Sequence, residues 1–130
     1  MSTAFEEFRA VHDRYLSIME HAYQTGETDA VASLLGPGYH GYYGMPDQDR
    51  AEYFDAAEAL AGIRQTAAHM PGVRAGCVGR LIRMPSATSA VVFYEKPMEF
   101  GERTVSAFVL EVWRQVDGRW VLVRETVEHL

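Results

Sequence analysis

The sequence predicts an α+β fold: a cone-shaped, curved antiparallel sheet wrapped on three N-terminal helices, with a pocket at the open end of the cone. In the front half of the chain, apolar residues recur at the helical spacings of three and four, whereas the back half alternates as strands do. The chain closes with two alternating runs around Asp117-Gly118, a dipeptide that favours a two-residue hairpin because both turn positions need a positive φ. Helices followed by an antiparallel meander are typical of α+β folds.

Two helices are expected before residue 36. Apolar residues at spacings of three and four predict the first over about 4–24, and Gly26 ends it. Thr28 or Asp29 can cap a short second helix that runs to Leu35.

The middle of the chain predicts a third helix and the first strands. Residues 39–44 are aromatic and glycine-rich, which indicates a short strand or a tight loop. A helix is expected from about 50 to 69, halted by Pro71-Gly72. Strands are then expected at 73–84, at 90–98 and in the closing hairpin.

The turn at Asp117-Gly118 sets a register in which opposite residue numbers sum to 235, so that Val112 faces Val123 and Leu110 faces Glu125. Opposite residues share a face of the sheet. One face then carries Phe108, Leu110, Val112, Val121, Val123, Glu125, Val127 and His129. The other carries Val109, Trp113, Trp120 and Leu122, with Glu111 opposite Arg124 as an expected ion pair.

Composition excludes several classes of protein. A chain of 130 residues with 48% hydrophobic and 23% charged side chains is expected to form a single domain over 1–130. The net charge of −6 argues against nucleic acid as a partner, and no apolar stretch approaches the roughly 20 residues that cross a membrane.

The single cysteine, Cys77, excludes an internal disulfide and fits an inert core thiol. With no apolar signal segment in residues 1–7, a soluble cytoplasmic protein is expected. No His, Asp or Cys pair has metal-ligand spacing, so neither a metal nor another cofactor is expected.

Three segments resemble the nuclear transport factor 2-like superfamily, in its SnoaL-like polyketide cyclase and ketosteroid isomerase-like branch. They are YQTGETDAVASLLGPGYHGYYG (23–44), AAHMPGVRAGCV (67–78) and VWRQVDGRWVLVRETVEHL (112–130). The similar features are a helix-ending proline before a long strand and a closing DGRW hairpin followed by an acidic residue. The resemblance implies a cystatin-like α+β barrel with a ligand-binding pocket. That superfamily includes isomerases, cyclases, dehydratases, carriers and dimerisation domains, so the resemblance implies a fold rather than a reaction.

The chain departs from the ketosteroid isomerases at the positions that carry their chemistry. Those enzymes have an oxyanion-stabilising Tyr seven residues before the glycine that ends the first helix, and a base Asp seventeen after it. Counted from Gly26, these positions hold Met19 and Tyr43, so the base is missing. Only Tyr15 or Tyr23, one helical turn away, can replace the tyrosine. The Arg and paired Asp of epoxide hydrolases are also absent.

The resemblance places one face of the last three strands on the concave side of the sheet. If the loop at Phe100-Gly101 is symmetric, Phe93 faces Phe108, and Glu95 faces Ser106 in a row that His129 completes. A carboxylate on a dry face has a raised pKa that suits general acid–base work. The candidate catalytic residues are therefore Glu125, Glu95 and His129. Two alternatives stay open: a slip of one residue turns Glu95 outward, and a structural hydrogen bond explains Glu125 equally well.

Aromatic side chains are the second signal of a ligand site. Tyrosines combine a rigid apolar face with a polar tip, which suits a flat, partly oxygenated ligand. The candidate substrate-binding residues are Tyr15, His40, Tyr42, Tyr43, Phe54, Phe93 and Phe108.

The outer face of the hairpin indicates self-association. Exposed, the apolar residues there would exceed the few hundred Å² that a soluble monomer tolerates. A homodimer through this outer sheet face (Val109, Trp113, Trp120 and Leu122) is expected, as is common in the superfamily.

Two functions of different class follow from these residues. The first is a cofactor-independent isomerase, cyclase or dehydratase that acts by proton transfer on a small hydrophobic, oxygenated molecule of polyketide type, as in secondary metabolism. The second is a non-catalytic ligand-binding or dimerisation module. An open cavity that contains a desolvated glutamate favours the enzyme, whereas a core filled by Phe54, Phe93 and Phe108 favours the module.

Overall fold

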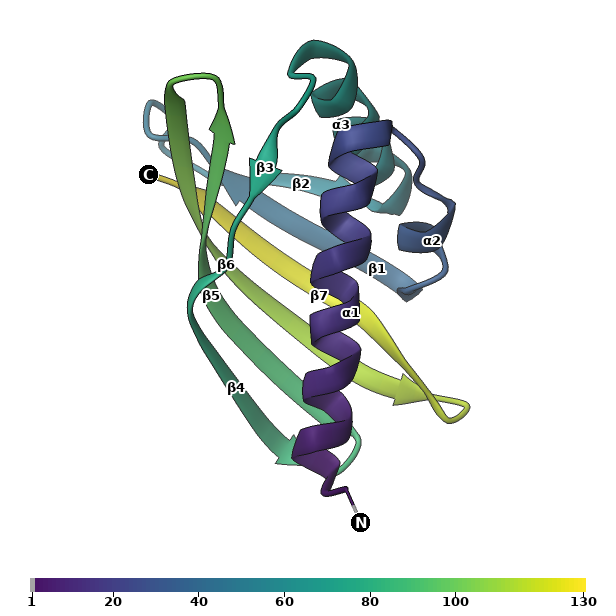
Figure 1. Cartoon of the computed structure of the whole chain (residues 1–130). Helices are drawn as coiled ribbons and strands as arrows, with labels where there is room; N and C mark the ends of the chain where they lie inside the picture. The colour runs from purple at the N-terminus through teal and green to yellow at the C-terminus, as the bar shows by residue number, and fades with distance from the viewer. Residues whose placement is uncertain (1) are drawn as a thin grey trace.

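The computed structural model describes residues 2–130, which form three helices and seven strands (Figure 1). The helices are α1 (Ala4–Thr25), α2 (Asp29–Ala32) and α3 (Ala56–His69). The strands are β1 (Leu35–Gly44), β2 (Glu52–Asp55), β3 (Arg74–Ala75), β4 (Val78–Ser86), β5 (Ser89–Phe100), β6 (Arg103–Val116) and β7 (Arg119–His129). The α+β class predicted from the sequence is confirmed. None of the described helices is long and apolar enough to cross a membrane.

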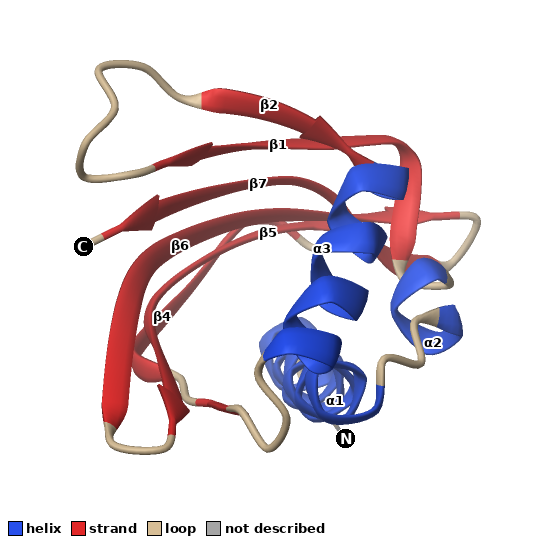
Figure 2. Cartoon of the chain, turned by 90° about the horizontal axis from the view of Figure 1, so that it is seen from above, coloured by secondary structure: helices blue, strands red, loops and turns tan. Residues whose placement is uncertain are grey.

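All strands belong to one curved sheet in the order β2-β1-β7-β6-β5-β3, with β4 also paired to β5. Strands β1 and β7 run parallel, whereas the other pairs are antiparallel, so the sheet is mixed and not purely antiparallel as expected. It also remains open and does not close into a barrel. Seen from above, the sheet bends around α1 and α3, which lie on its concave side (Figure 2).

The first helix begins and ends where local chemistry requires. The Thr3 side chain accepts a hydrogen bond from the backbone N–H of Glu6, which caps the N-terminus. At the other end Gly26 has φ 79°, the left-handed conformation that glycine adopts without a steric penalty. The buried face of α1 consists of Phe8, His12, Tyr15 and Ala22.

The expected helix over 50–69 is wrong in its first third. Residues Glu52–Asp55 form β2, which pairs with β1 through Tyr42 and Tyr53. Helix α3 starts only after Asp55, whose side chain and that of Glu58 form a reciprocal capping box. The second helix is likewise shorter than expected, because Leu35 already pairs with Leu122 of β7.

The closing hairpin has the expected turn but not the expected register throughout. Both Asp117 and Gly118 have positive φ, and pairs beside the turn sum to 235. Farther from the turn, a bulge makes Val123 an extra residue of β7. From the pair Val112–Arg124 to the pair Ala107–His129, the numbers of opposite residues therefore sum to 236. This extra residue reverses the facing of everything beyond it, and Glu125 lies opposite Glu111 on the concave side.

The bulge overturns the expected pairing of Glu111 with Arg124. Arg124 lies opposite Val112 on the convex side, and its guanidinium stacks over the ring of Tyr42. Glu111 is 0% exposed and contacts other partners inside the domain.

The hairpin of β5 and β6 is displaced by two residues from the symmetric arrangement. Phe100 pairs with Arg103, so the turn is Gly101-Glu102 and pairs sum to 203 instead of 201. Glu95 therefore lies opposite Phe108 and not Ser106, and Phe93 lies opposite Leu110.

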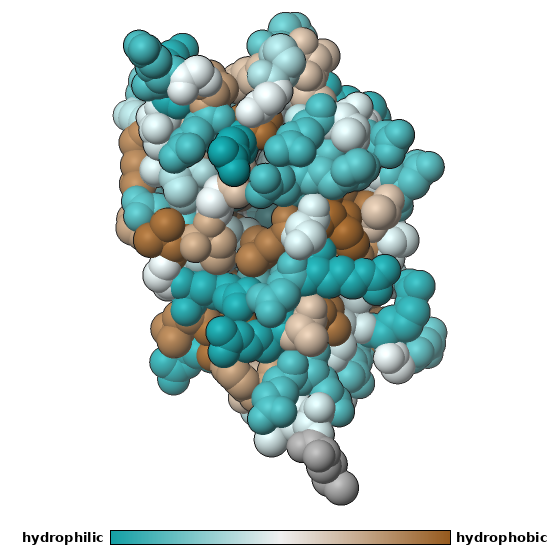
Figure 3. Space-filling model, viewed as in Figure 1, coloured by the Kyte–Doolittle hydropathy of each residue, from teal (hydrophilic) through white to brown (hydrophobic). Residues whose placement is uncertain are grey.

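The core lies between α1 and the concave side of the sheet. It is built around Phe8, Trp113 and Leu122, all 0% exposed. Val109 is also buried there, and Trp120 packs against the ring of Phe8. The expected dimer surface of Val109, Trp113, Trp120 and Leu122 is therefore wrong, because these side chains fill the monomer's own core. The side of the domain that carries α1 is mainly hydrophilic, with hydrophobic patches between polar residues (Figure 3).

Candidate functional site

A cavity of about 630 Å³, hereafter the chamber, lies between the ends of α1 and α3 and the concave side of the sheet. Its wall combines apolar side chains, including Met19, Phe54, Met98 and Val127, with polar ones. The polar groups include Tyr23 on α1, Tyr43 on β1, Lys96 on β5, and Glu125 and His129 on β7, with Glu52 and Glu58 near the rim; Tyr53, Gln65, Thr66 and Ser106 also line it. A largely apolar wall with a few convergent polar groups is typical of small-molecule sites.

Glu125 is the carboxylate of the chamber. It is partly buried, and Tyr39 donates its O–H to Oε1 at 2.5 Å. Gly41 lies opposite Glu125 in β1, where an added Cβ would come within 2.6 Å of the Glu125 carbonyl oxygen. Burial first, and then the negative charge of Glu111, raise the pKa of Glu125; the Tyr39 hydrogen bond and the Lys96 charge oppose this but do not cancel it.

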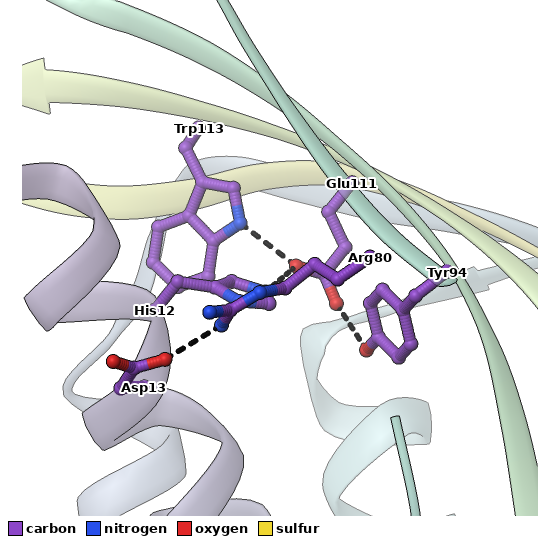
Figure 4. Close-up of polar contacts among 6 residues, drawn as sticks. All are labelled: His12, Asp13, Arg80, Tyr94, Glu111 and Trp113. Carbon is purple, nitrogen blue, oxygen red and sulfur yellow. Dashed lines mark hydrogen bonds and ion pairs between the residues drawn. The ribbon is translucent and has the colours of Figure 1, made fainter. Parts of the chain in front are cut away.

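Glu111 lies one strand away and is fully hydrogen-bonded (Figure 4). Its Oε1 accepts from His12 Nε2 at 2.8 Å and from Trp113 Nε1 at 2.9 Å, and its Oε2 accepts from the Tyr94 hydroxyl at 2.5 Å. Three donors from three different side chains fix the position of this carboxyl group. Burial and this carboxylate together raise the pKa of Tyr94, so the phenol remains a donor.

The hydrogen bonds of His12 fix its tautomer. Arg80 Nη1 lies 3.0 Å from His12 Nδ1, and a guanidinium can only donate, so Nδ1 accepts. The ring proton therefore lies on Nε2 and is donated to Glu111. Arg80 also forms a 2.7 Å ion pair with Asp13, which extends the network to the surface (Figure 4).

Lys96 and Tyr23 form the second polar pair of the chamber. Lys96 Nζ donates to the Tyr23 hydroxyl oxygen at 3.0 Å. Burial lowers the pKa of Lys96, but the oxygen of Tyr23 and the carboxylates of Glu125 and Glu111 outweigh it, so the pKa is raised and the amine is held as an ammonium.

Four of the residues predicted from the sequence lie on the chamber wall: Glu125, His129, Tyr43 and Phe54. His129 is occupied by a 3.0 Å contact between Nδ1 and the carbonyl of Gly44, and it lies opposite Ala107. Tyr43 donates its hydroxyl to Glu52 at 2.7 Å. The expected partnership of His129 with Glu95 does not form, because the two residues lie on opposite faces of the sheet.

Five of the predicted residues face outward instead. Glu95, Phe93 and Phe108 share the convex face, where the two phenylalanines are 40% and 57% exposed. The other two are His40, which stacks on Tyr53, and Tyr42, which contacts Arg124. The expectation that these five line the chamber is wrong, because the face that carries Phe93, Glu95 and Phe108 is the convex one, and Tyr42 and His40 point to the same side as Arg124.

Tyr15 is neither outward nor on the chamber wall. It is buried in the core edge-to-face against Trp113, at 5.0 Å between ring centroids. Of the two tyrosines that might replace the isomerase tyrosine, only Tyr23 reaches the chamber.

Sequence reasoning missed Glu111, Lys96 and Tyr39 as site residues, and it named Tyr23 only as a replacement for the isomerase tyrosine. A usable signal existed for two of them. Glu111 alternates with the strongly apolar Val109 and Trp113, and Lys96 follows Val92 and Tyr94 at the same period. Such an alternation places a charged side chain on the buried face of its strand. Tyr39 carried no comparable signal, since its bond to Glu125 depends on the parallel pairing of β1 with β7.

Among residues 2–130, no group of three or more His, Cys, Asp or Glu side chains is arranged to hold a metal ion. The chemistry that the chamber offers is that of a carboxyl group with a raised pKa, an ammonium and several phenols.

Comparison with known proteins gives likeness of structure only. No protein-family model matches the chain, and no curated protein sequence does. An NTF2-like protein from Cytophaga hutchinsonii is similar at TM-score 0.71 and 17% identity, over 94% of this chain and 98% of that one. The CamKII hub homology domain of Chlamydomonas reinhardtii is similar at 0.73 and 20%, over 100% and 99%. A candidate scytalone dehydratase from Novosphingobium aromaticivorans is similar at 0.70 and 15%, over 95% and 84%.

The chain thus has the NTF2-like, or cystatin-like, fold that its sequence resemblance implies. At these identities the likeness establishes the fold alone.

Proposed function

We propose that this protein is a cofactor-independent acid–base catalyst that isomerises, cyclises or dehydrates a small hydrophobic, oxygenated molecule bound in the chamber. The observation that carries the proposal is Glu125, a partly buried carboxyl group with a raised pKa on the wall of an apolar cavity. A pKa raised toward neutrality lets one carboxyl group both accept and return a proton.

The neighbours of Glu125 support this role. Tyr39 holds one carboxyl oxygen by a hydrogen bond, which leaves the other oxygen for the substrate. Glu111 lies opposite, where three donors hold its carboxyl group, and after burial its charge is the next cause that raises the pKa of Glu125. Glu111 therefore raises the proton affinity of Glu125 without touching the substrate. The candidate scytalone dehydratase among the similar structures is consistent with this class of reaction.

A proton-exchange measurement tests the proposal. Small ketones are incubated with the protein in D₂O, and loss of their α-protons is followed by NMR. The wild type is expected to accelerate exchange, and Glu125→Gln to slow it by about 10²-fold or more, the usual contribution of a general base. Glu95→Gln on the convex face is the matched control and should exchange like the wild type. Equal rates for wild type and Glu125→Gln would remove Glu125 from the reaction.

A second role, self-association, is favoured by the convex face of the sheet. Leu81 lies opposite Phe93, and Phe93 opposite Leu110, in one row, with Phe108 in the next; Leu81 is 50% exposed. Apolar side chains gathered on one face usually mark a contact surface. The similarity to a CamKII hub homology domain agrees with assembly of this fold. We propose a homodimer through this convex face, which sedimentation at micromolar concentration tests: a mass of 14.6 kDa would contradict it.

A further inference from the structure

We propose that Lys96 and Tyr23 anchor the carbonyl oxygen of the substrate and stabilise it as an enolate oxyanion, so that the chamber accepts enolisable carbonyl compounds. This inference rests on the proposed function, because it names the substrate class of the same site. Four observations support it: the burial of Lys96, its lack of a counter-ion, the free proton of Tyr23, and the position of both opposite Glu125.

Lys96 is placed where lysines are rarely found. It is the only lysine of a chain with twelve basic residues, and it lies on the concave face two positions after the buried Tyr94. Its side chain is partly buried on the chamber wall. Lysines avoid the interior unless their charge is paired, because a buried ammonium loses its hydration. The position of Lys96 therefore calls for a counter-charge.

Within residues 2–130 no carboxylate lies within 4.0 Å of the Lys96 ammonium. The side-chain hydrogen bond that Lys96 makes there is the 3.0 Å bond to Tyr23, whose ring centroid lies 5.1 Å from Nζ. An ammonium has three donors, so two of them remain for a ligand in the chamber. An oxygen atom that carries negative charge is the group that satisfies both the charge and the donors.

The Tyr23 hydroxyl is arranged as a second donor. Its oxygen accepts the hydrogen bond from Lys96, so its own proton is not used in that bond. Among the described residues it has no other side-chain hydrogen-bond partner. An oxygen placed against the pair can accept one bond from the ammonium and one from the phenol. Two preorganised donors at a developing oxyanion are the arrangement that stabilises enolates.

Glu125 faces the same chamber and completes the geometry. Its carboxyl group and the Lys96 ammonium affect each other's charge but form no ion pair, and both line the same cavity of about 630 Å³. The other titratable groups on the wall are Tyr43, Tyr53, His129, and Glu52 and Glu58 near the rim. Tyr43 is bonded to Glu52, and His129 contacts a carbonyl, which leaves Glu125 as the base of the chamber.

The reaction step then balances without a co-reactant. Glu125 takes a proton from the carbon next to the carbonyl, the C–H electron pair becomes the carbon–carbon double bond, and the carbonyl π pair moves onto oxygen. Lys96 and Tyr23 donate hydrogen bonds to that oxygen. Return of the proton from Glu125 to the same carbon, on either face, with collapse of the enolate, regenerates the carbonyl compound with its α-proton exchanged or its α-carbon inverted.

The test uses 4-nitrophenol, a probe whose absorbance reports ionisation and whose phenolate resembles an enolate, with 4-nitroanisole as the matched neutral ring. In the wild type we expect bound 4-nitrophenol to ionise at a pH at least about one unit below that of the free phenol, which is about tenfold tighter binding of the phenolate. Lys96→Met should lose that tenfold preference while binding 4-nitroanisole as the wild type does. Lys96→Arg, which keeps the charge, should retain part of it, and Tyr23→Phe should weaken it less than Lys96→Met.

The outcomes separate this inference from the proposed function. If 4-nitrophenol binds un-ionised, or if its ionisation survives in Lys96→Met, the anchoring site is wrong, even where Glu125→Gln abolishes proton exchange. If the phenolate preference depends on Lys96 but Glu125→Gln exchanges like the wild type, the anchoring site stands and the proposed base does not. Failure of both probes to bind overturns the chamber as a ligand site and both proposals with it.

Discussion

Glu111 and Glu125 lie directly opposite each other on β6 and β7, yet one accepts three hydrogen bonds from protein side chains and the other accepts one. This asymmetry separates their chemistry. Glu111 is 0% exposed and held by its three donors, whereas Glu125 faces the chamber with a raised pKa. In the proposed reaction Glu111 acts through its charge, and Glu125 exchanges the proton.

Replacement of Glu111 by Gln should lower the pKa of Glu125, because the charge that raises it is removed. The variant should also unfold more easily, by about 1–3 kcal/mol, since an amide nitrogen would face donors that now bond to a carboxylate. Carboxyl ¹³C NMR titration and urea unfolding measure the two effects. Glu95→Gln is the control for both, and an unchanged Glu125 titration would contradict the coupling.

The stability of the domain should depend on pH through Glu125. Because its pKa in the folded protein is raised above the ordinary 4.5, the protonated form favours folding. Its contribution is fully present below pH 4.5 and is lost as the pH rises through the folded pKa. The unfolding free energy of the wild type minus that of Glu125→Gln should therefore fall over that interval. Urea unfolding at several pH values measures it, and a difference that rises with pH would refute the assignment.

The tautomer of His12 is a third prediction. Because Arg80 donates to Nδ1, the ring should carry its proton on Nε2. Long-range ¹H–¹⁵N NMR spectra of the ring distinguish the two tautomers. Arg80→Met should relax the preference, whereas the exposed substitution Arg83→Met on the same strand should not. A proton on Nδ1 in the wild type would contradict the network as described.

Two glycines give a matched pair of stability tests. A methyl group at Gly41 would meet the Phe54 ring and come within 2.6 Å of the Glu125 carbonyl oxygen, so Gly41→Ala should cost about 1–3 kcal/mol. In Gly62→Ala the methyl group enters open space on α3, and the variant should gain about 0.5–1 kcal/mol from its higher helix propensity. Thermal or urea unfolding compares them. Equal effects would mean that β1 and β7 approach less closely than described.

Phe108→Asp should dissociate the proposed homodimer, because it places a charge beside the exposed convex row of Leu81 and Phe93. Val116→Asp, also at an exposed position of β6 but beside the hairpin turn, is the control. Sedimentation velocity gives the mass of each variant. A dimer that survives Phe108→Asp and is lost in Val116→Asp would move the interface to the hairpin end.

Features set by neighbouring residues were predictable from the sequence. The left-handed Gly26 and the turn at Asp117-Gly118 both form as expected, because each depends on a few adjacent residues. The start of α3 could also have been predicted from the sequence, because Asp55 and Glu58 have the spacing of a capping box. The fold class and the order of the main helices and strands follow from such local signals.

The facing of the strands was not predictable in the same way. Whether Glu125 shares a face with Glu111 or with Phe108 depends on the bulge at Val123, and which face is concave depends on how the sheet packs against α1. Both depend on how distant segments pack: Trp113 and Leu122 share a core cluster with Phe8 of α1. Of the proposed catalytic residues Glu125 and His129 reach the chamber, but through a bulge that the assumed register did not contain.

The single inserted residue at Val123 has an implication for how such a chain changes over time. If the bulge were lost while Val123 was kept, Glu125, Val127 and His129 would turn to the convex side, and Arg124, Thr126 and Glu128 would face the interior, with no side chain altered. Gain or loss of a bulge in this strand can thus exchange Glu125 for Arg124 on the concave side. Proteins that share this architecture can diverge in reactivity through such a shift while their aligned residues stay the same.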